Sequence, residues 1–122
     1  MERLMFTFAL RPGQEDEYER RHQAVWPALL HDLYEAGWRN YSLFRRDLQI
    51  YAYAECHPDV ATALQRMSAS QANRDWAQWF TEVIDELTDD SGALFVADEV
   101  WHLDEQAASH QPPARDDPAV SS

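Results

Sequence analysis

The chain has 122 residues, of which 45% are hydrophobic, and its 22 acidic residues against 10 basic ones give a net charge of −12. This length suits one domain that buries a real core. The charge repels nucleic-acid phosphates and anionic membrane surfaces, so no nucleic acid and no membrane are expected among its partners.

The single cysteine, Cys56, cannot form an internal disulfide, which is typical of a reducing compartment. It ends an apolar run, so a buried small side chain is expected rather than a reactive thiol. No signal-peptide pattern precedes the first apolar run, and no apolar run approaches the length of a membrane-spanning helix. We expect a soluble cytoplasmic protein.

The chain opens with a strand and a long, interrupted helix. Large apolar residues at every second position predict a strand over residues 3–10. A helix is expected over residues 14–36, with acidic residues in its first turn, where the helix dipole favours them. Pro27 falls inside this pattern and predicts a kink or a restart. Gly37 is a natural stop for the helix.

Two strands follow at close spacing. They are expected over residues 38–45 and 49–55, and the short link between them predicts an antiparallel hairpin. In the second of them Ile50, Ala52 and Ala54 alternate with larger polar and aromatic residues. Both faces of this strand can therefore be covered.

The second half repeats the helix-then-strand order. A helical region opens at residues 57–59, weakens at residues 68–70 and continues as an apolar stripe to Leu87. After a loop over residues 88–92, alternating side chains predict the last strand over residues 93–103.

The resulting order, β-α-β-β-α-β, predicts an α+β fold of the ferredoxin-like kind: a four-stranded antiparallel sheet with helices on one face. The other face carries large apolar and aromatic residues that should not stay wet. We therefore expect a homodimer whose two sheets close into a dimeric α/β barrel. The folded domain would span residues 1–104, and the composition of residues 105–122 predicts a flexible tail.

Three ring side chains share one face of the first helix. Tyr18, His22 and Trp26 follow at intervals of four residues, which places them on the same side. Tyr41 in the second strand and Trp76 in the second helical region could converge with them. A lone histidine on a helix is more often a packing or surface residue, but an imidazole among aromatic rings can exchange protons near neutral pH. That combination favours a small sugar as the substrate.

Other chemistries lack their motifs. Glu19 and His22 have the Glu-x-x-His spacing of di-iron carboxylate bundles, but a second copy and two further glutamates are missing. No G-x-S-x-G motif, glycine-rich phosphate loop or redox-cofactor motif occurs. We expect neither a metal nor a cofactor.

The chain resembles the L-rhamnose mutarotase family in a set of residues spread over its length: Tyr18-Glu19-Arg20-Arg21-His22, Val25-Trp26-Pro27, Gly37, Asn40-Tyr41, Glu55 and Asp75-Trp76. The likeness runs from about residue 1 to residue 103. It implies a dimeric ferredoxin-like fold and interconversion of the α and β anomers of a 6-deoxy-L-sugar.

The resemblance also implies residue roles. His22 would be the proton donor, and Tyr18 would contact the sugar and assist catalysis. Tyr41 and Trp76 would bind substrate, together with the position that Ala77 occupies. The general base is not identified by the sequence.

Ala77 replaces the second tryptophan of a pair in the family, so one aromatic wall is missing, and Trp79 is a candidate to replace it. This change leaves the sugar open, with L-rhamnose expected and L-fucose as the nearest alternative. Two other classes of protein stay open: a small dimeric-barrel monooxygenase that acts on quinols or haem, and a non-catalytic sugar binder.

Overall fold

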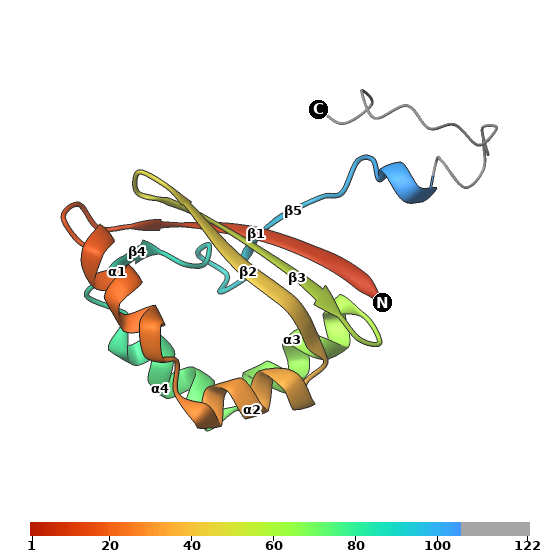
Figure 1. The fold of residues 1–122 in the computed structure, drawn as a ribbon, viewed down its shortest axis with the longest axis horizontal. Helices are drawn as coiled ribbons and strands as arrows, with labels where there is room; N and C mark the ends of the chain where they lie inside the picture. Colours follow the sequence, from red (N-terminus) through yellow and green to blue (C-terminus); the bar gives the residue numbers. More distant parts are fainter. Residues whose placement is uncertain (106–122) are drawn as a thin grey trace, which may run out of the picture.

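The first strand, β1, forms the centre of an antiparallel sheet. It pairs with β3 on one side and with β4 and β5 on the other, and β3 also pairs with β2, which gives the order β2-β3-β1-β4 (Figure 1). The strands are β1 (Glu2–Leu10), β2 (Trp38–Arg46), β3 (Gln49–Cys56), β4 (Ile84–Glu86) and β5 (Phe95–Ala97). The predicted ferredoxin-like arrangement is confirmed.

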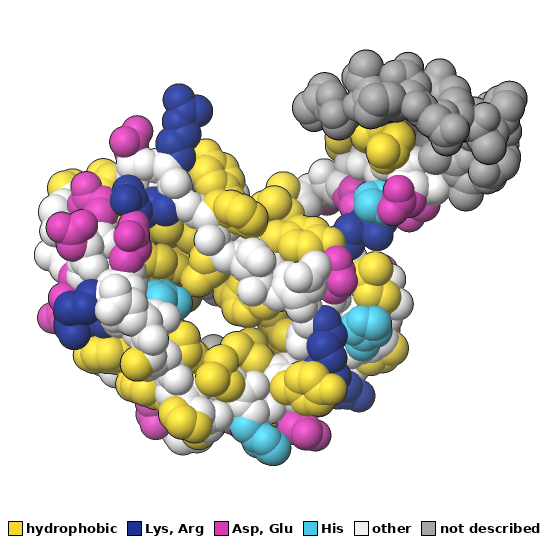
Figure 2. All heavy atoms as spheres, in the orientation of Figure 1, with side chains coloured by type: hydrophobic (Ala, Val, Ile, Leu, Met, Phe, Trp, Pro, Cys, Tyr) yellow, Lys and Arg dark blue, Asp and Glu magenta, His cyan; other side chains and the backbone are white. Residues whose placement is uncertain are grey.

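The helices before Phe80 lie along one face of this sheet in the computed structural model, which describes residues 1–105 (Figure 1). They are α1 (Glu15–Arg21), the 3₁₀ turn η1 (His22–Ala24), α2 (Pro27–Glu35), α3 (Val60–Ser68) and α4 (Gln71–Trp79). Their side chains do not fill the whole space beneath the sheet. Figure 2 shows a hollow between the sheet and the helices, edged largely by hydrophobic side chains.

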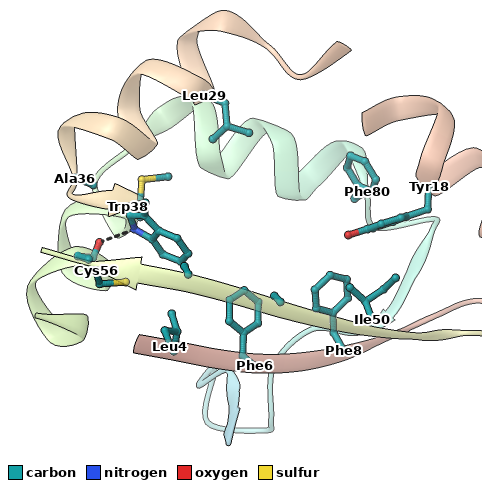
Figure 3. Packing of buried hydrophobic residues seen from close by; sticks show 14 of the residues in the cluster. Leu4, Phe6, Phe8, Tyr18, Leu29, Ala36, Trp38, Ile50, Cys56 and Phe80 are labelled. Atoms are coloured by element: carbon teal, nitrogen blue, oxygen red, sulfur yellow. Dashed lines mark hydrogen bonds between the residues drawn. The ribbon is translucent and has the colours of Figure 1, made fainter. Parts of the chain in front are cut away.

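The core lies between the sheet and the helices, and the alternation in β1 and β3 sets its composition. The even-numbered residues of β1 from Leu4 to Leu10 are all buried, and so are Ile50, Ala52 and Ala54 of β3 (Figure 3). Successive side chains of a strand point to opposite faces, so each strand turns one apolar face to the helices. The predicted alternation is confirmed in both strands.

The break in the first helical region is also confirmed. Val25 and Trp26 are extended, with ψ of 138° and 132°, and Pro27 is the first residue of α2. Proline disfavours the helical conformation in the residue before it, whereas it fits the first position of a new helix. Gly37 then ends α2 with φ of 100°, close against the carbonyl oxygen of His57, where no other residue would fit.

The second helical region is shorter than the sequence predicts. It divides at residues 68–70 as expected, because the Ser70 hydroxyl caps α4 by accepting from the backbone N–H of Asn73. Its predicted continuation to Leu87 is wrong, since α4 ends at Trp79. Phe80 and Val83 are still buried, but a turn brings them inward, with the N–H of Val83 donating to the Phe80 carbonyl at 2.9 Å. A spacing of three residues fits such a turn as well as a helix.

The predicted last strand over residues 93–103 is also wrong in extent. Two short strands occupy the edge beside β1: β4 pairs with its end at Leu10, and β5 pairs with residues 5–7. A loop between them is closed by a bridge between Thr88 and Leu94. Only three residues of the predicted last strand, Phe95–Ala97, pair with β1. The prediction was too long because an alternating pattern of side chains does not determine where backbone pairing ends.

Within residues 1–105, no helix is long and apolar enough to cross a membrane. The predicted tail lies almost entirely outside the described residues, so the proposed domain boundary stays a prediction.

Candidate active site

Tyr18 and His22 lie where α1 passes into η1. Their rings face each other with centroids 4.3 Å apart, as the spacing of four residues predicts. Nδ1 of His22 lies 2.8 Å from the backbone carbonyl oxygen of Tyr18. A carbonyl oxygen only accepts hydrogen bonds, so Nδ1 carries the proton and Nε2 of the neutral ring keeps a free lone pair.

The half-buried position of His22 controls its charge. Burial lowers the pKa of His22 below its ordinary value of 6.5, and the hydrogen bond to the Tyr18 carbonyl opposes this shift. The imidazole is therefore mainly neutral at neutral pH. A neutral imidazole with a free Nε2 accepts a proton first and can later return it.

Aromatic side chains from the end of α4 enclose this imidazole. The ring centroid of Trp76 lies 5.4 Å from that of His22, and the ring centroid of Phe80 lies 5.2 Å from it. Trp26 packs edge-on against Trp76 at 4.9 Å. Trp76 is thus beside His22, as its position in the second helical region suggested, whereas Phe80 was not predicted as a site residue because its place on the apolar stripe indicated only core packing.

The hydroxyl of Tyr18 points into the space between the sheet and the helices (Figure 3). The residue is only 5% exposed, yet its hydroxyl makes no hydrogen bond within residues 1–105. Burial raises the pKa of Tyr18 well above its usual range, and the neighbouring Tyr41 phenol raises it further. The phenol stays protonated and offers a hydrogen bond to whatever enters.

Tyr41 reaches the same interior space from β2. Its ring centroid lies 5.0 Å from that of the buried Trp38, and its phenol is close enough to Tyr18 to affect the pKa of that residue. The ring is 39% exposed, but protein atoms desolvate the hydroxyl and raise the pKa of Tyr41 to about 12. Tyr41 is thus a second neutral phenol, packed against Trp38 on β2.

A cavity of about 380 Å³ opens between α1 and the β2–β3 hairpin. At its rim, Nε of Arg45 donates to a carboxylate oxygen of Glu19 at 2.5 Å. Tyr41, Trp76 and Ala77 do not belong to its lining. The lining residues are Tyr18, Glu19, His22, Gln23, Leu43, Phe44, Arg45 and Ile50. Sequence reasoning missed most of them, although Glu19 and Gln23 each directly follow a predicted site residue.

Arg21 fastens the end of α1 to the end of α4. Its guanidinium, almost wholly buried, donates to the Trp79 carbonyl at 2.6 Å and forms ion pairs with Glu17 and Glu82. It also lies 4.5 Å from the centroid of the Trp79 ring, which stacks on Trp26. Trp79 therefore covers Arg21 and is not among the residues that line this cavity, and its suggested role as a replacement for the missing tryptophan stays a prediction.

The described part of the chain offers no cluster of three or more His, Cys, Asp or Glu side chains able to hold a metal ion. The polar groups at the cavity are instead single hydrogen-bonding groups: a phenol, an imidazole, an amide and one ion pair. Such a set suits a neutral, hydroxyl-rich molecule better than an anionic one.

Comparison with known proteins gives one consistent family. The family model described as L-rhamnose mutarotase matches residues 3–103. The chain is 30% identical to the L-rhamnose mutarotase of Oceanobacillus iheyensis over 106 residues, which are 85% of this chain and 100% of the relative. It is 31% identical to the L-rhamnose mutarotase of Phocaeicola vulgatus, also over 106 residues, with the same coverage of both chains.

Two solved structures share the fold. The L-rhamnose mutarotase of Formosa agariphila superposes with a TM-score of 0.68 at 22% identity, covering 84% of this chain and 98% of that one. Tetracenomycin F2 cyclase from Streptomyces glaucescens, a type-II polyketide cyclase, superposes with a TM-score of 0.54 at 19% identity, covering 84% and 96%. At these identities the two structures show the common fold alone.

Proposed function

The chain belongs to the L-rhamnose mutarotase family, and on that premise we propose that it is a carbohydrate isomerase that interconverts the α and β anomers of L-rhamnose. The observation that carries the proposal is the fixed tautomer of His22. Its Nδ1–H is held by the Tyr18 carbonyl, so a free Nε2 remains next to the phenol ring of Tyr18. This pair supplies both partners that an anomer exchange needs, a proton acceptor and a hydrogen-bond donor.

Ring opening requires one proton to leave the sugar and another to arrive. Nε2 of His22 takes the proton of the anomeric hydroxyl, and the oxygen lone pair forms the C1 carbonyl. The bond from C1 to the ring oxygen breaks with its electron pair going to that oxygen. The Tyr18 hydroxyl, which burial keeps protonated, donates its proton there as the bond breaks and is left as a phenolate beside the imidazolium of His22.

Ring closure reverses these transfers after rotation about the C1–C2 bond. The ring hydroxyl attacks the other face of the carbonyl carbon and returns its proton to Tyr18, while the imidazolium of His22 protonates the carbonyl oxygen. His22 is the proton donor in this half, the role that the resemblance implies, and the proton acceptor in the other half. Tyr41, Trp76 and the Ala77 position would contact the sugar around this pair.

The experiment is saturation-transfer NMR between the two anomers of L-rhamnose, with L-fucose measured in parallel. The protein should accelerate exchange of L-rhamnose more than exchange of L-fucose, and His22→Asn should lose about 10² to 10⁴-fold of the catalysed rate. The matched control is His31→Asn, which changes an exposed histidine on α2 and should leave the rate unchanged. No acceleration with either sugar would refute the reaction. Full activity of His22→Asn would refute the role of His22.

We also propose that the chain forms a homodimer through the outer face of its sheet. A row of side chains crosses this face on neighbouring strands, in the order Phe44, Tyr51, Thr7 and Phe95. The three aromatic rings of this row are all exposed. Such a row is stabilised when a second copy covers it. Light scattering should find a dimer, Tyr51→Glu should yield a monomer, and Leu30→Glu on the helical side should remain dimeric. A monomeric parent chain would contradict the proposal.

The cytoplasmic location is likewise a proposal. Its support is Cys56, which is fully buried and carries a free thiol. Fractionation of cells that express the protein at its natural level tests it, and recovery outside the cytoplasmic fraction would count against it.

A further inference from the structure

Strand β2 contains a bulge at the point where it enters the site. Trp38 pairs with Cys56 and Arg39 with Glu55, but the next pair is Ser42 with Tyr53, so the two residues between them, Asn40 and Tyr41, share one partner position on β3. A β-bulge of this kind shifts the alternation of the strand by one residue. Side chains on either side of it keep the same face despite an odd spacing.

The shift decides where Tyr41 points. In a regular strand, Tyr41 would lie on the face opposite to Trp38, because it follows three positions later and the period is two. With the bulge, Tyr41 shares the inner face with Trp38 and with Leu43, which lies opposite the buried Ala52.

Asn40 provides the conformation that the bulge needs. Its φ is 50°, in the left-handed region that asparagine tolerates better than most residues. Its side-chain amide donates to a carboxylate oxygen of Glu55 at 3.2 Å, and the same oxygen accepts from the Tyr53 hydroxyl at 2.8 Å. Both hydrogen bonds favour the ionised carboxylate and hold the pKa of Glu55 below its usual range. The hydrogen bond from Asn40 to Glu55 thus stabilises the bulge from the outer face of the sheet.

We propose that Asn40 and Glu55 are positioning residues for anomer exchange: they hold the bulge that turns Tyr41 inward, so that its hydroxyl can bind the sugar. The proposal rests on the proposed mutarotase function. It assigns Asn40 and Glu55 no contact with substrate, and their effect should pass entirely through Tyr41. This last consequence separates a positioning role from a general contribution to folding.

The test compares Asn40→Ala, Asn40→Gly and Glu55→Gln, each with Tyr41 intact and with Tyr41→Phe. Saturation-transfer NMR at several L-rhamnose concentrations gives KM and kcat separately. Tyr41→Phe should raise KM by about three- to tenfold, the loss of one neutral hydrogen bond. Asn40→Ala should raise KM similarly, and Asn40→Gly less, because glycine keeps the left-handed conformation but lacks the amide. In the Tyr41→Phe background, Asn40→Ala should raise KM no further.

Asp47→Ala is the matched control. Asp47 also has a left-handed backbone, with φ of 53°, but it lies in the turn after β2, away from Tyr41. It should lower stability to urea as Asn40→Ala does and leave KM unchanged. A readout independent of activity is the nuclear Overhauser contact between the Tyr41 and Trp38 rings, which Asn40→Ala should weaken and Asn40→Gly should keep.

The outcomes separate the two proposals. A parent chain that does not accelerate exchange refutes the function, while the ring contact still tests the bulge. An active parent whose KM is unchanged in Asn40→Ala refutes the positioning role, and so does an equal further rise of KM in the Tyr41→Phe background. If Asn40→Ala does not fold, Asn40→Gly and Glu55→Gln carry the same comparison.

Discussion

Replacing Tyr18 with phenylalanine should leave the protein at least as stable and make it less active. The phenylalanine ring keeps the packing of Tyr18, whose centroid lies 5.7 Å from that of Phe80 and 6.1 Å from that of Phe8. The lost hydroxyl makes no hydrogen bond within residues 1–105, but it borders the hollow and is not among the fully buried side-chain atoms that lack a partner. A fully buried polar group without a partner costs about 1–3 kcal/mol. Because water can reach this hydroxyl, its cost is at most the lower end of that range.

Urea unfolding of Tyr18→Phe should therefore show a free energy of unfolding equal to that of the parent or higher by up to about 1 kcal/mol, where 1 kcal/mol corresponds to about 4–8 °C in Tm for a domain of this size. The catalysed exchange of L-rhamnose anomers should fall by about 10² to 10⁴-fold, because the ring oxygen loses its proton donor. Tyr34→Phe, at an exposed tyrosine of α2, should change neither quantity. A loss of stability with full activity in Tyr18→Phe would refute the reasoning, since the hydroxyl would then be structural.

Three further predictions concern charge. Burial lowers the pKa of His22 from 6.5, so the catalysed rate should be constant from about pH 7 to about pH 8 and fall only below pH 6.5. The free energy of unfolding should also fall below pH 6.5, because the unfolded chain binds a proton that the folded chain does not. A catalysed rate that already falls above pH 6.5 would contradict this. The free energy of unfolding in urea should decline above pH 10, because burial raises the pKa of Tyr41 from 10.0 to about 12 and only the unfolded chain releases the phenol proton. Tyr41→Phe should reduce this decline. Arg21→Met should lower the free energy of unfolding in urea by about 1.5–3 kcal/mol, the range for a hydrogen bond to a charged group. Arg20→Met, which removes an exposed partner of the same Glu17, should lower it by less than about 0.5 kcal/mol.

The parts of the fold that the sequence predicted correctly are those decided by a buried face or a single rigid residue. The alternation in β1 survives because one face of the strand is covered along its whole length. Pro27 breaks the helix whatever surrounds it, because it lacks an N–H and restricts Trp26.

The parts that were predicted incorrectly depend on partners that are distant in the sequence. The apolar spacing of residues 76–87 satisfies a helix followed by a turn as well as a longer helix. Strand β5 ends at Ala97, whereas residues 98–103 continue the alternation of side chains without joining the sheet. The sequence pattern shows which side chains are apolar, but it does not show which strand the backbone of these residues will pair with.

The candidate site was predictable in its residue types and only partly in its geometry. The spacing placed Tyr18 and His22 on one face, and their rings are in contact. The inward turn of Tyr41 depends on one left-handed residue, but the sequence does carry a sign of it. The inner residues Trp38, Tyr41 and Leu43 follow at intervals of three and then two, and this break in a two-residue period indicates a bulge.

The tautomer of His22 is set at the C-terminal end of α1. The Tyr18 carbonyl oxygen accepts from a backbone N–H group at this helix end and also from Nδ1–H of His22, at 2.8 Å. Both hydrogen bonds can form because a carbonyl oxygen has two lone pairs. Pro27 acts separately, because it keeps Trp26 extended and begins α2. The spacing of four residues therefore fixes the proton on the imidazole: it brings Nδ1 of His22 back to the carbonyl of Tyr18 and leaves Nε2 free for the sugar.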